Sequence, residues 1–208
     1  MAQLSRIFVD EPGIVSFTIP TLPVEYADVV TDPKSTPARG VAVPPSEFTI
    51  RCLQRDEWRL LKALRLRALA CDPQSYWESV EDASARDDAY WNTCAGIVTT
   101  PAGSRMFLVE HPESVAAFVF GIKKDDDAYS VGGLWVDPVH RRKGLGSLLV
   151  QQVVTWARAD SHAARIRLWC HTGPPLSFYQ RNGFQSLDRL RTNDLDGRQI
   201  VEMEWRGI

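Results

Sequence analysis

The chain has 208 residues, of which 44% are hydrophobic and 24% charged, a composition typical of globular proteins and unlike that of disordered chains. Its 24 Lys and Arg residues against 26 Asp and Glu residues give a formal net charge of −2, so it lacks the basic excess of a nucleic-acid binder. The longest apolar runs, such as Val115–Ile122, are too short to cross a bilayer, and the first residues do not resemble a signal peptide. We therefore expect a cytoplasmic protein with neither a nucleic-acid nor a membrane partner.

The first 46 residues form a segment of their own, because they hold seven of the 13 prolines. Proline lacks a backbone N–H, which excludes long helices there. The short β-prone runs Ile7–Val9 and Ile14–Ile19 favour an ordered arm of one or two strands over a mobile tail. We expect residues 1–46 to form this arm and residues 47–208 to form the main domain. The arm would lie on this domain or on a partner, and a homodimer formed through it is an open alternative.

From Ser46 onward, strand and helix patterns alternate, which predicts an α/β fold. Strands are expected at Phe48–Leu53, Met106–Val109, Val115–Ile122, Ala128–Val136 and Ile166–Cys170, followed by a hairpin of Phe184–Leu190 and Ile200–Trp205. Helices are expected at Arg55–Ala70, Tyr76–Ala95, Lys143–Ala159 and Pro175–Asn182.

The cysteines give no sign of a metal site. Cys52, Cys71, Cys94 and Cys170 form no CxxC pair and have no histidine at metal-ligand spacing. We expect no bound metal, and we interpret these residues as reduced thiols of the protein interior.

The most informative stretch is Leu134–Leu149, which reads LWVDPVHRRKGLGSLL. A strand is expected to end at Val136 and a helix to begin near Lys143, with two glycines at the junction. Glycine lets backbone N–H groups come close to a ligand, and the first N–H groups of a helix attract anions. The stretch matches neither the Walker loop nor the dinucleotide fingerprint. It predicts a pyrophosphate site, and the alternative is a helix N-terminus beside a solvated basic turn.

Two motifs resemble those of the GNAT N-acetyltransferases. Arg141-x-x-Gly144-x-Gly146 resembles the [RQ]xxGx[GA] acyl-CoA motif of that family, and the run FYQRNGF, residues 178–184, resembles its FYxxxGF segment. The resemblance covers roughly residues 47–206. It implies the α/β GNAT fold, a mixed, mostly antiparallel central sheet that is splayed at the middle and flanked by helices. Gly132-Gly133 would mark a bulge in the strand before the loop.

The resemblance also implies acetyl-CoA as cosubstrate. The loop would hold the pyrophosphate, and the end of the preceding strand would pair with the pantetheine. The residues assigned to acetyl-CoA in this way are Leu134, Trp135, Val136, Arg141, Arg142, Lys143, Gly144, Leu145, Gly146, Ser147, Thr172 and Tyr179.

Acetylation of an amine requires a neutral amine, a stabilised oxyanion and a protonated leaving thiolate. The resemblance implies that Tyr179 is the general acid. Many relatives carry a glutamate in the strand before the loop, but that strand reads AYSVGGLWV here. His171 is our candidate base, because the ordinary pKa of histidine suits one. Glu110 and a chain of water molecules are open alternatives.

An acceptor pocket is expected around the first two helices and the strand before the loop, where acidic and aromatic side chains suggest a cationic amine. The candidate residues are Tyr76, Trp77, Glu78, Glu81 and Tyr129. The alternative is that the acidic residues form a solvated helix face. We expect direct transfer of an acetyl group to a primary amine of a small molecule in a ternary complex. The alternatives are a protein lysine or N-terminal acetyltransferase and a non-catalytic acyl-CoA-binding regulatory module.

Overall fold

The computed structural model describes residues 47–100, 103–124, 127–160, 165–193 and 196–207. The predicted arm of residues 1–46 lies outside these residues, so its structure and the proposed boundary at residue 47 remain predictions.

A seven-stranded sheet with the order β1-β2-β3-β4-β5-β7-β6 forms the centre of the described chain. Its strands are β1 (Thr49–Cys52), β2 (Arg105–His111), β3 (Ser114–Lys123), β4 (Ala128–Val136), β5 (Arg165–His171), β6 (Phe184–Thr192) and β7 (Gln199–Trp205). Neighbouring strands run antiparallel except β4 and β5, which run parallel. The predicted mixed, mostly antiparallel sheet is confirmed.

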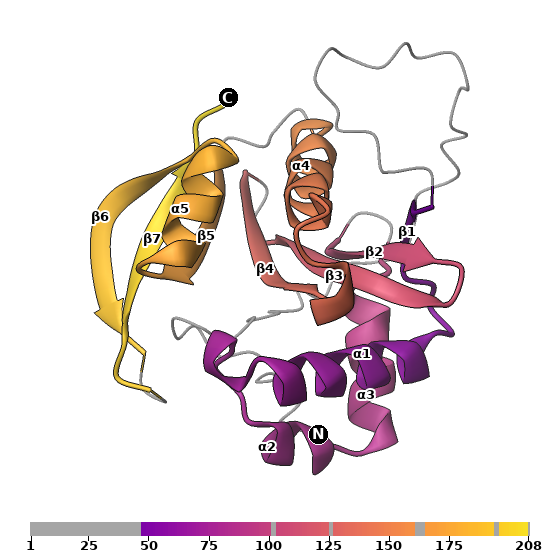
Figure 1. Ribbon diagram of the computed structural model, residues 1–208. Coiled ribbons are helices and arrows are strands. Elements are labelled where there is room, and N and C mark those ends of the chain that lie inside the picture. The colour runs from indigo at the N-terminus through magenta and orange to yellow at the C-terminus, as the bar shows by residue number, and fades with distance from the viewer. Residues whose placement is uncertain (1–46, 101–102, 125–126, 161–164, 194–195, 208) are drawn as a thin grey trace, which may run out of the picture.

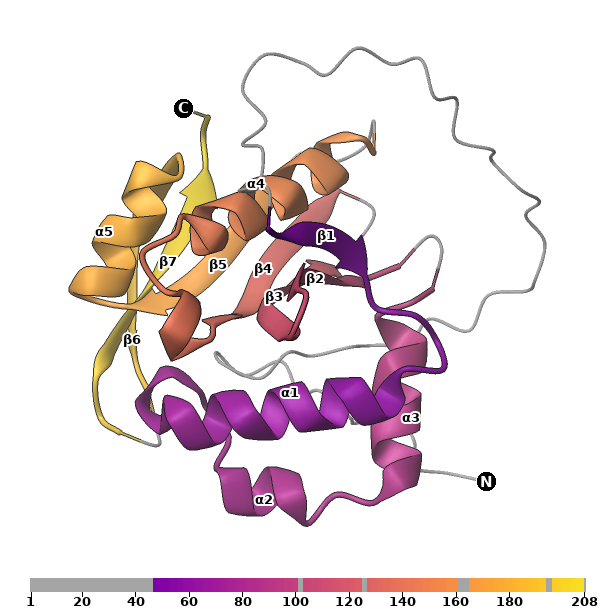
Figure 2. The ribbon, with the colours of Figure 1, turned by 45° about the vertical axis from the view of Figure 1, so that its right-hand side comes forward.

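Helices cover both faces of the sheet (Figures 1 and 2). The helices are α1 (Trp58–Cys71), α2 (Val80–Ser84), α3 (Asp88–Ile97), α4 (Leu145–Arg158) and α5 (Pro174–Arg181), with short 3₁₀ turns η1 (Pro73–Ser75) and η2 (Pro138–His140). One apolar core lies between α1–α3 and one face of β2–β4, and a second lies between the other face and α4 and α5. In β3, Val119 faces the α4 core and Phe118 the α1 core, which explains why the predicted central strand is apolar on both faces.

The expected single helix over Tyr76–Ala95 is wrong, because the structure divides this stretch. The Ser79 hydroxyl accepts a hydrogen bond from the N–H of Asp82 at 3.0 Å and starts α2. The Asp87 carboxylate accepts one from the N–H of Tyr90 at 2.8 Å and starts α3. Each cap residue has an extended backbone, and this backbone geometry ends a helix before a new one begins.

The sheet opens between its two parallel strands. β4 and β5 pair at Ala128–Ser130 with Arg165–Arg167, and beyond these residues the structure shows no pairing between them. A bulge follows in β4, because β3 advances from Phe118 to Phe120 while β4 retreats from Trp135 to Gly132. The extra residue lies where Gly133 has a φ of +56°, and a Cβ there would lie 2.8 Å from Cδ2 of Phe120. The predicted splay and bulge are confirmed.

Candidate active site

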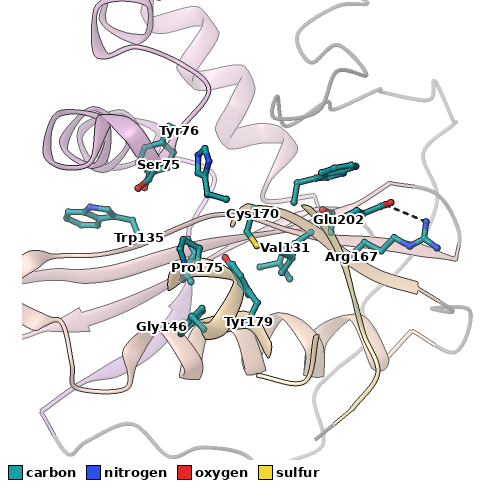
Figure 3. Close-up of a pocket in the computed structure, with 18 of the residues that line it drawn as sticks. Ser75, Tyr76, Val131, Trp135, Gly146, Arg167, Cys170, Pro175, Tyr179 and Glu202 are labelled. Atoms are coloured by element: carbon teal, nitrogen blue, oxygen red, sulfur yellow. Dashed lines mark ion pairs between the residues drawn. The ribbon is translucent and has the colours of Figure 1, made fainter. Parts of the chain in front are cut away.

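A cleft of about 1390 Å³ lies where β4 and β5 diverge. Its lining comes from these two strands, the loop before α4, the start of α5, the segment after α1 and the β6–β7 hairpin. Figure 3 shows Tyr179 and Cys170 at its centre, with Gly146 on one side and the Arg167–Glu202 ion pair on the other. Strand divergence therefore creates one space that can be reached from both faces of the sheet.

The loop before α4 presents backbone N–H groups to this cleft. Gly144 precedes the helix with a φ of +82°, a conformation that favours glycine, and a Cβ there would meet no described atom within 4 Å. The N–H of Leu148 makes the first turn bond, to the carbonyl of Gly144 at 3.1 Å. The N–H groups before it, from Leu145 to Ser147, have no partner within the helix and lie at the positive end of its dipole. The arrangement suits a pyrophosphate.

Gly146 serves a different purpose from the one expected of a phosphate loop. A Cβ at this position would lie 3.3 Å from the ring of Phe178 and 3.8 Å from Cγ2 of Val136. The missing side chain therefore lets α5 pack closely against the start of α4, which brings Tyr179, the next residue of α5, to the cleft.

Asp72 holds the loop in place through hydrogen bonds to Trp135 and Arg141, a role that the sequence alone did not indicate. One oxygen of its carboxylate accepts from Nε1 of Trp135 at 3.0 Å and from the guanidinium of Arg141 at 2.5 Å. Arg141 also donates from Nε to the carbonyl of Val136 at 3.0 Å. Because Arg141 is already paired, Arg142 supplies the cationic side chain of the loop that remains for a ligand.

Most residues predicted for acetyl-CoA border the cleft. These are Leu134, Trp135, Val136, Arg141, Arg142, Gly144, Leu145, Gly146, Ser147 and Tyr179. The Trp135 ring itself is buried against Phe118, so this residue offers its backbone. Two predicted residues lie outside the lining: Lys143 pairs with Glu47 at 3.1 Å, and Thr172 is exposed to solvent.

Tyr179 lies half-buried on α5, with its ring against those of Phe178 and Phe184 at centroid distances of 5.0 and 5.8 Å. Burial raises the pKa of Tyr179, with smaller contributions from Cys170 and Tyr76, which keeps the hydroxyl protonated near neutral pH. Its hydroxyl has no hydrogen-bond partner among the described residues. It is therefore available as a proton donor.

Cys170 lies beside Tyr179 (Figure 3) but is not an activated thiol. Burial raises the pKa of Cys170 to about 12, and its Sγ contacts Sδ of Met203 at 3.6 Å. A thiolate is the nucleophilic form of cysteine, so this residue offers no nucleophile at neutral pH.

His171 lies on the opposite face of β5 from Cys170, since side chains alternate along a strand. Its ring stacks on Trp77 at 6.1 Å, and its Nε2 lies 3.3 Å from the Arg198 guanidinium and 3.9 Å from the Asp196 carboxylate. Burial and then the charge of Arg198 lower the pKa of His171, and Asp196 opposes them. The imidazole is therefore neutral near pH 7 and can accept a proton.

The predicted acceptor residues are only partly brought together. Tyr76 and Trp77 line the cleft. Tyr129 on β4 also lines the cleft, while its hydroxyl donates to Asp160 at 2.5 Å and its ring packs on Trp156. Glu78 pairs with Arg65 at 3.3 Å, and Glu81 is exposed on α2, so neither carboxylate lines the cleft.

Two further expectations concern residues outside the cleft. Glu110, the alternative base, pairs with Arg51 at 2.8 Å and does not line the cleft. Among the described residues, no three His, Cys, Asp or Glu side chains come together as metal ligands, and no helix is long and apolar enough to span a membrane.

The sequence analysis missed the basic wall of the cleft, made by Arg167, Arg189 and Arg191 with Glu202. The alternation in β5, RIRLWCH, is the signal that points to it, since every second residue is apolar and faces the α4 core. In β6 a bulge between Ser186 and Leu190 breaks the alternation, so the sequence pattern does not show which residues face the cleft.

Two solved structures of acetyltransferases share this architecture. An acetyltransferase of the GNAT family from Streptococcus pneumoniae superposes with a TM-score of 0.64 at 16% identity, covering 76% of this chain and 98% of that one. The spermidine N-acetyltransferase from Vibrio cholerae, solved with CoA and spermine, superposes with a TM-score of 0.59 at 15% identity, covering 77% and 95%. These likenesses establish the fold.

The sequence establishes the family: the chain belongs to the Acetyltransferase (GNAT) family, whose profile matches residues 64–184. The mycothiol acetyltransferase of Saccharomonospora viridis is 30% identical over 109 residues, which make up 50% of this chain and 33% of that protein. The matched part thus spans about a third of that relative's length.

Proposed function

We propose that this protein is an acetyl-CoA-dependent N-acetyltransferase that acts on a primary amine of a small molecule by direct attack in a ternary complex. The observation that carries the proposal is the unpaired edge of β4 beyond Ser130, which lies between the start of α4 and Tyr179. An exposed strand edge can bind an extended ligand as an additional strand. Acetyl-CoA is such a ligand, because its pantetheine arm carries amide groups.

The residues present fit this cosubstrate. The open space at Gly144 and the N–H groups of Leu145–Ser147 would hold the pyrophosphate, with Arg142 as the cationic partner. The backbone of Leu134–Val136 would hold the pantetheine. The thioester would then lie at the splay between Tyr179 on one face and His171 on the other. Acetyl-CoA supplies the acyl group as a thioester.

The two proton transfers take place on opposite faces of the sheet, where β4 and β5 diverge. Neutral His171 takes a proton from the acceptor ammonium, directly or through water, and the free amine attacks the thioester carbonyl carbon. A C–N bond forms and the C–S bond breaks. Tyr179 donates a proton to the leaving sulfur and regains one from the attacking nitrogen through water, so that the nitrogen ends as a neutral amide. Because burial raises the pKa of Cys170, this thiol is poorly suited to form an acyl-enzyme, which favours direct transfer.

A small acceptor suits the geometry of the acceptor side. Arg198, before β7, donates to the carbonyl of Gln74 after α1 and lies beside His171. This contact bridges the segment after α1 and the segment before β7, next to the candidate base. A free small molecule fits such a bridged opening better than a segment of folded protein.

Calorimetric titration with acetyl-CoA tests the proposal. Wild-type protein should bind, and Arg142→Glu should raise the Kd about tenfold or more, because it places a negative charge at the pyrophosphate. Arg181→Glu is the matched control, since Arg181 is exposed on α5 outside the cleft. Release of CoA thiol on addition of an amine should accompany binding. Binding without thiol release for any amine would instead identify a non-catalytic acyl-CoA module.

A further inference from the structure

The acceptor side of the cleft is basic. Eight basic side chains line the whole cleft against three acidic ones, although the chain as a whole has a net charge of −2. The basic residues are Arg65, Lys124, Arg141, Arg142, Arg165, Arg167, Arg189 and Arg191, and the acidic ones are Asp72, Asp188 and Glu202. Arg141 and Asp72 neutralise each other, and Arg142 belongs to the phosphate loop. Arg65, Arg165 and Arg167 also pair with carboxylates, those of Glu78, Asp127 and Glu204, so few guanidinium groups of the lining remain without an acidic partner.

The buried carboxylate of this wall is already paired. Glu202 on β7 lies 3.0 Å from the guanidinium of Arg189 and 3.7 Å from that of Arg167, and its side chain is 10% exposed. A carboxylate held between two guanidinium groups offers little attraction to a cationic ligand. Among the described acidic residues of the lining, Asp188 alone has no ion pair, and it is exposed on the β6 bulge.

Arg191 is the available guanidinium. Its guanidinium carbon lies 5.0 Å from the centroid of the Trp169 ring. No carboxylate of the described residues pairs with it. A guanidinium held over an indole keeps its planar set of donors for a carboxylate, which it binds through two parallel hydrogen bonds.

Sheet register places Arg191 in the same row as the candidate base. Arg191 of β6 faces Ile200 of β7, and Ile200 faces His171 of β5. Adjacent strands lie about 4.8 Å apart, so Arg191 and His171 are about 10 Å apart at the backbone. Both side chains border the cleft, with Trp169 one step along β5 from His171. In this row Ile200 lies between the two residues, and the Trp169 indole beneath the Arg191 guanidinium supplies a neighbouring apolar surface.

We propose that the acceptor is an amino carboxylate, with its amine at His171 and its carboxylate at Arg191, an inference that rests on the proposed acetyltransferase function. The backbone spacing calls for an amine and a carboxylate separated by several bonds, as in an ω-amino acid or a short peptide. The aliphatic or peptide portion between them lies against Trp169. An amino carboxylate differs from the cationic amine expected from the sequence. That expectation relied on Glu78 and Glu81, which lie outside the cleft lining.

A panel of acceptors with equal chain length tests the proposal. γ-Aminobutyrate, its primary amide, butylamine and putrescine differ at the far end, which is anionic, neutral polar, apolar or cationic. Glycylglycine and its amide extend the comparison to a peptide. We expect the kcat/KM of each carboxylate to exceed that of its amide by about tenfold or more. Equal values, a preference for putrescine, or no turnover of either carboxylate would overturn the proposal.

Variants at Arg191 show whether this residue binds the acceptor or the cofactor. Arg191→Gln should raise the KM for γ-aminobutyrate about tenfold and leave that for butylamine unchanged. Arg191→Lys should restore part of the loss, and Arg181→Gln is the control of equal charge. The acetyl-CoA Kd of Arg191→Gln should stay within about twofold, and a larger rise would assign Arg191 to a cofactor phosphate and overturn the proposal. Failure of wild-type protein to bind acetyl-CoA would instead refute the proposed function.

Discussion

At the scale of residues, the proposed chemistry depends on two side chains of opposite character on opposite sides of one strand. Tyr179 is held protonated by burial, and His171 is held neutral by burial and by Arg198. The shift of Tyr179 comes mainly from burial, whereas the charged Arg198, 3.3 Å from Nε2 of His171, adds to the effect of burial on His171. The division of acid and base follows from the alternation of β5 and from the packing of α5 beneath it.

Replacing the tyrosine hydroxyl tests the acid. Tyr179→Phe should lower kcat by about 10²-fold, because the leaving thiolate loses its proton donor. The acetyl-CoA Kd, measured by calorimetry, should change by less than about twofold, because the ring packing against Phe178 and Phe184 is kept. An unchanged kcat would exclude Tyr179 as the acid.

The lowered pKa of His171 predicts a pH dependence of folding. As the pH falls below the ordinary histidine value of 6.5, the unfolded chain binds a proton that the folded His171 still refuses. The free energy of unfolding therefore falls with decreasing pH. Urea denaturation between about pH 8 and pH 5 should show a steeper loss for wild type than for His171→Gln. Equal slopes for the two proteins would contradict the shifted pKa.

The sequence reveals some of these residues and hides others. Gly144 and Tyr179 could be found because they belong to local motifs of fixed spacing. Asp72 belongs to no motif of the sequence, although it lies 3.0 Å from the indole of Trp135, 63 positions further along the chain. Arg191 could not be assigned to the cleft, since its direction depends on the bulge in β6. Contacts between distant segments leave no periodic pattern.

At the scale of elements, the bulge in β4 requires a glycine at position 133, and the strand edge beside this bulge is proposed to bind acetyl-CoA. Gly133→Ala should destabilise the fold by about 2 kcal/mol, because its φ is positive and a Cβ would press on Phe120. It should also weaken acetyl-CoA binding, because the free edge of β4 shifts. Thermal unfolding and calorimetry measure the two effects.

Gly121→Ala is the matched control for this prediction. A Cβ at Gly121 would lie 2.6 Å from the Trp156 ring beneath α4, which should cost about 1–3 kcal/mol. Because Gly121 does not line the cleft, the acetyl-CoA Kd should not change. Equal losses of affinity in both variants would show that general destabilisation, and not the bulge, governs binding.

Element types were more predictable than element boundaries. The alternation of β5 and the apolar stripe of α4 gave the correct elements, since periodicity reports which face is buried. The single helix expected over Tyr76–Ala95 was wrong, because the caps at Ser79 and Asp87 each start a separate helix. A serine or aspartate at the start of an apolar run was the available signal.

At the scale of the molecule, every described strand and the whole cleft lie within residues 47–207. We therefore propose that residues 47–208 form the catalytic domain. Deletion of residues 1–45 should leave the midpoint of thermal unfolding and the acetyl-CoA Kd nearly unchanged, and the mass in solution reports any dimer formed through the arm. Loss of binding by the shortened protein, together with a fall from dimer to monomer mass, would show that the arm completes the site.

Direct acetyl transfer to an amine can be tested by mass spectrometry of a single turnover. Enzyme, a limiting amount of acetyl-CoA and γ-aminobutyrate are mixed, and both the small molecules and the intact protein are weighed. The account predicts one N-acetylated product for each CoA released and no acetyl group on the protein at Cys170. An acetylated cysteine, or bound acetyl-CoA that acetylates no amine of the panel, would contradict it.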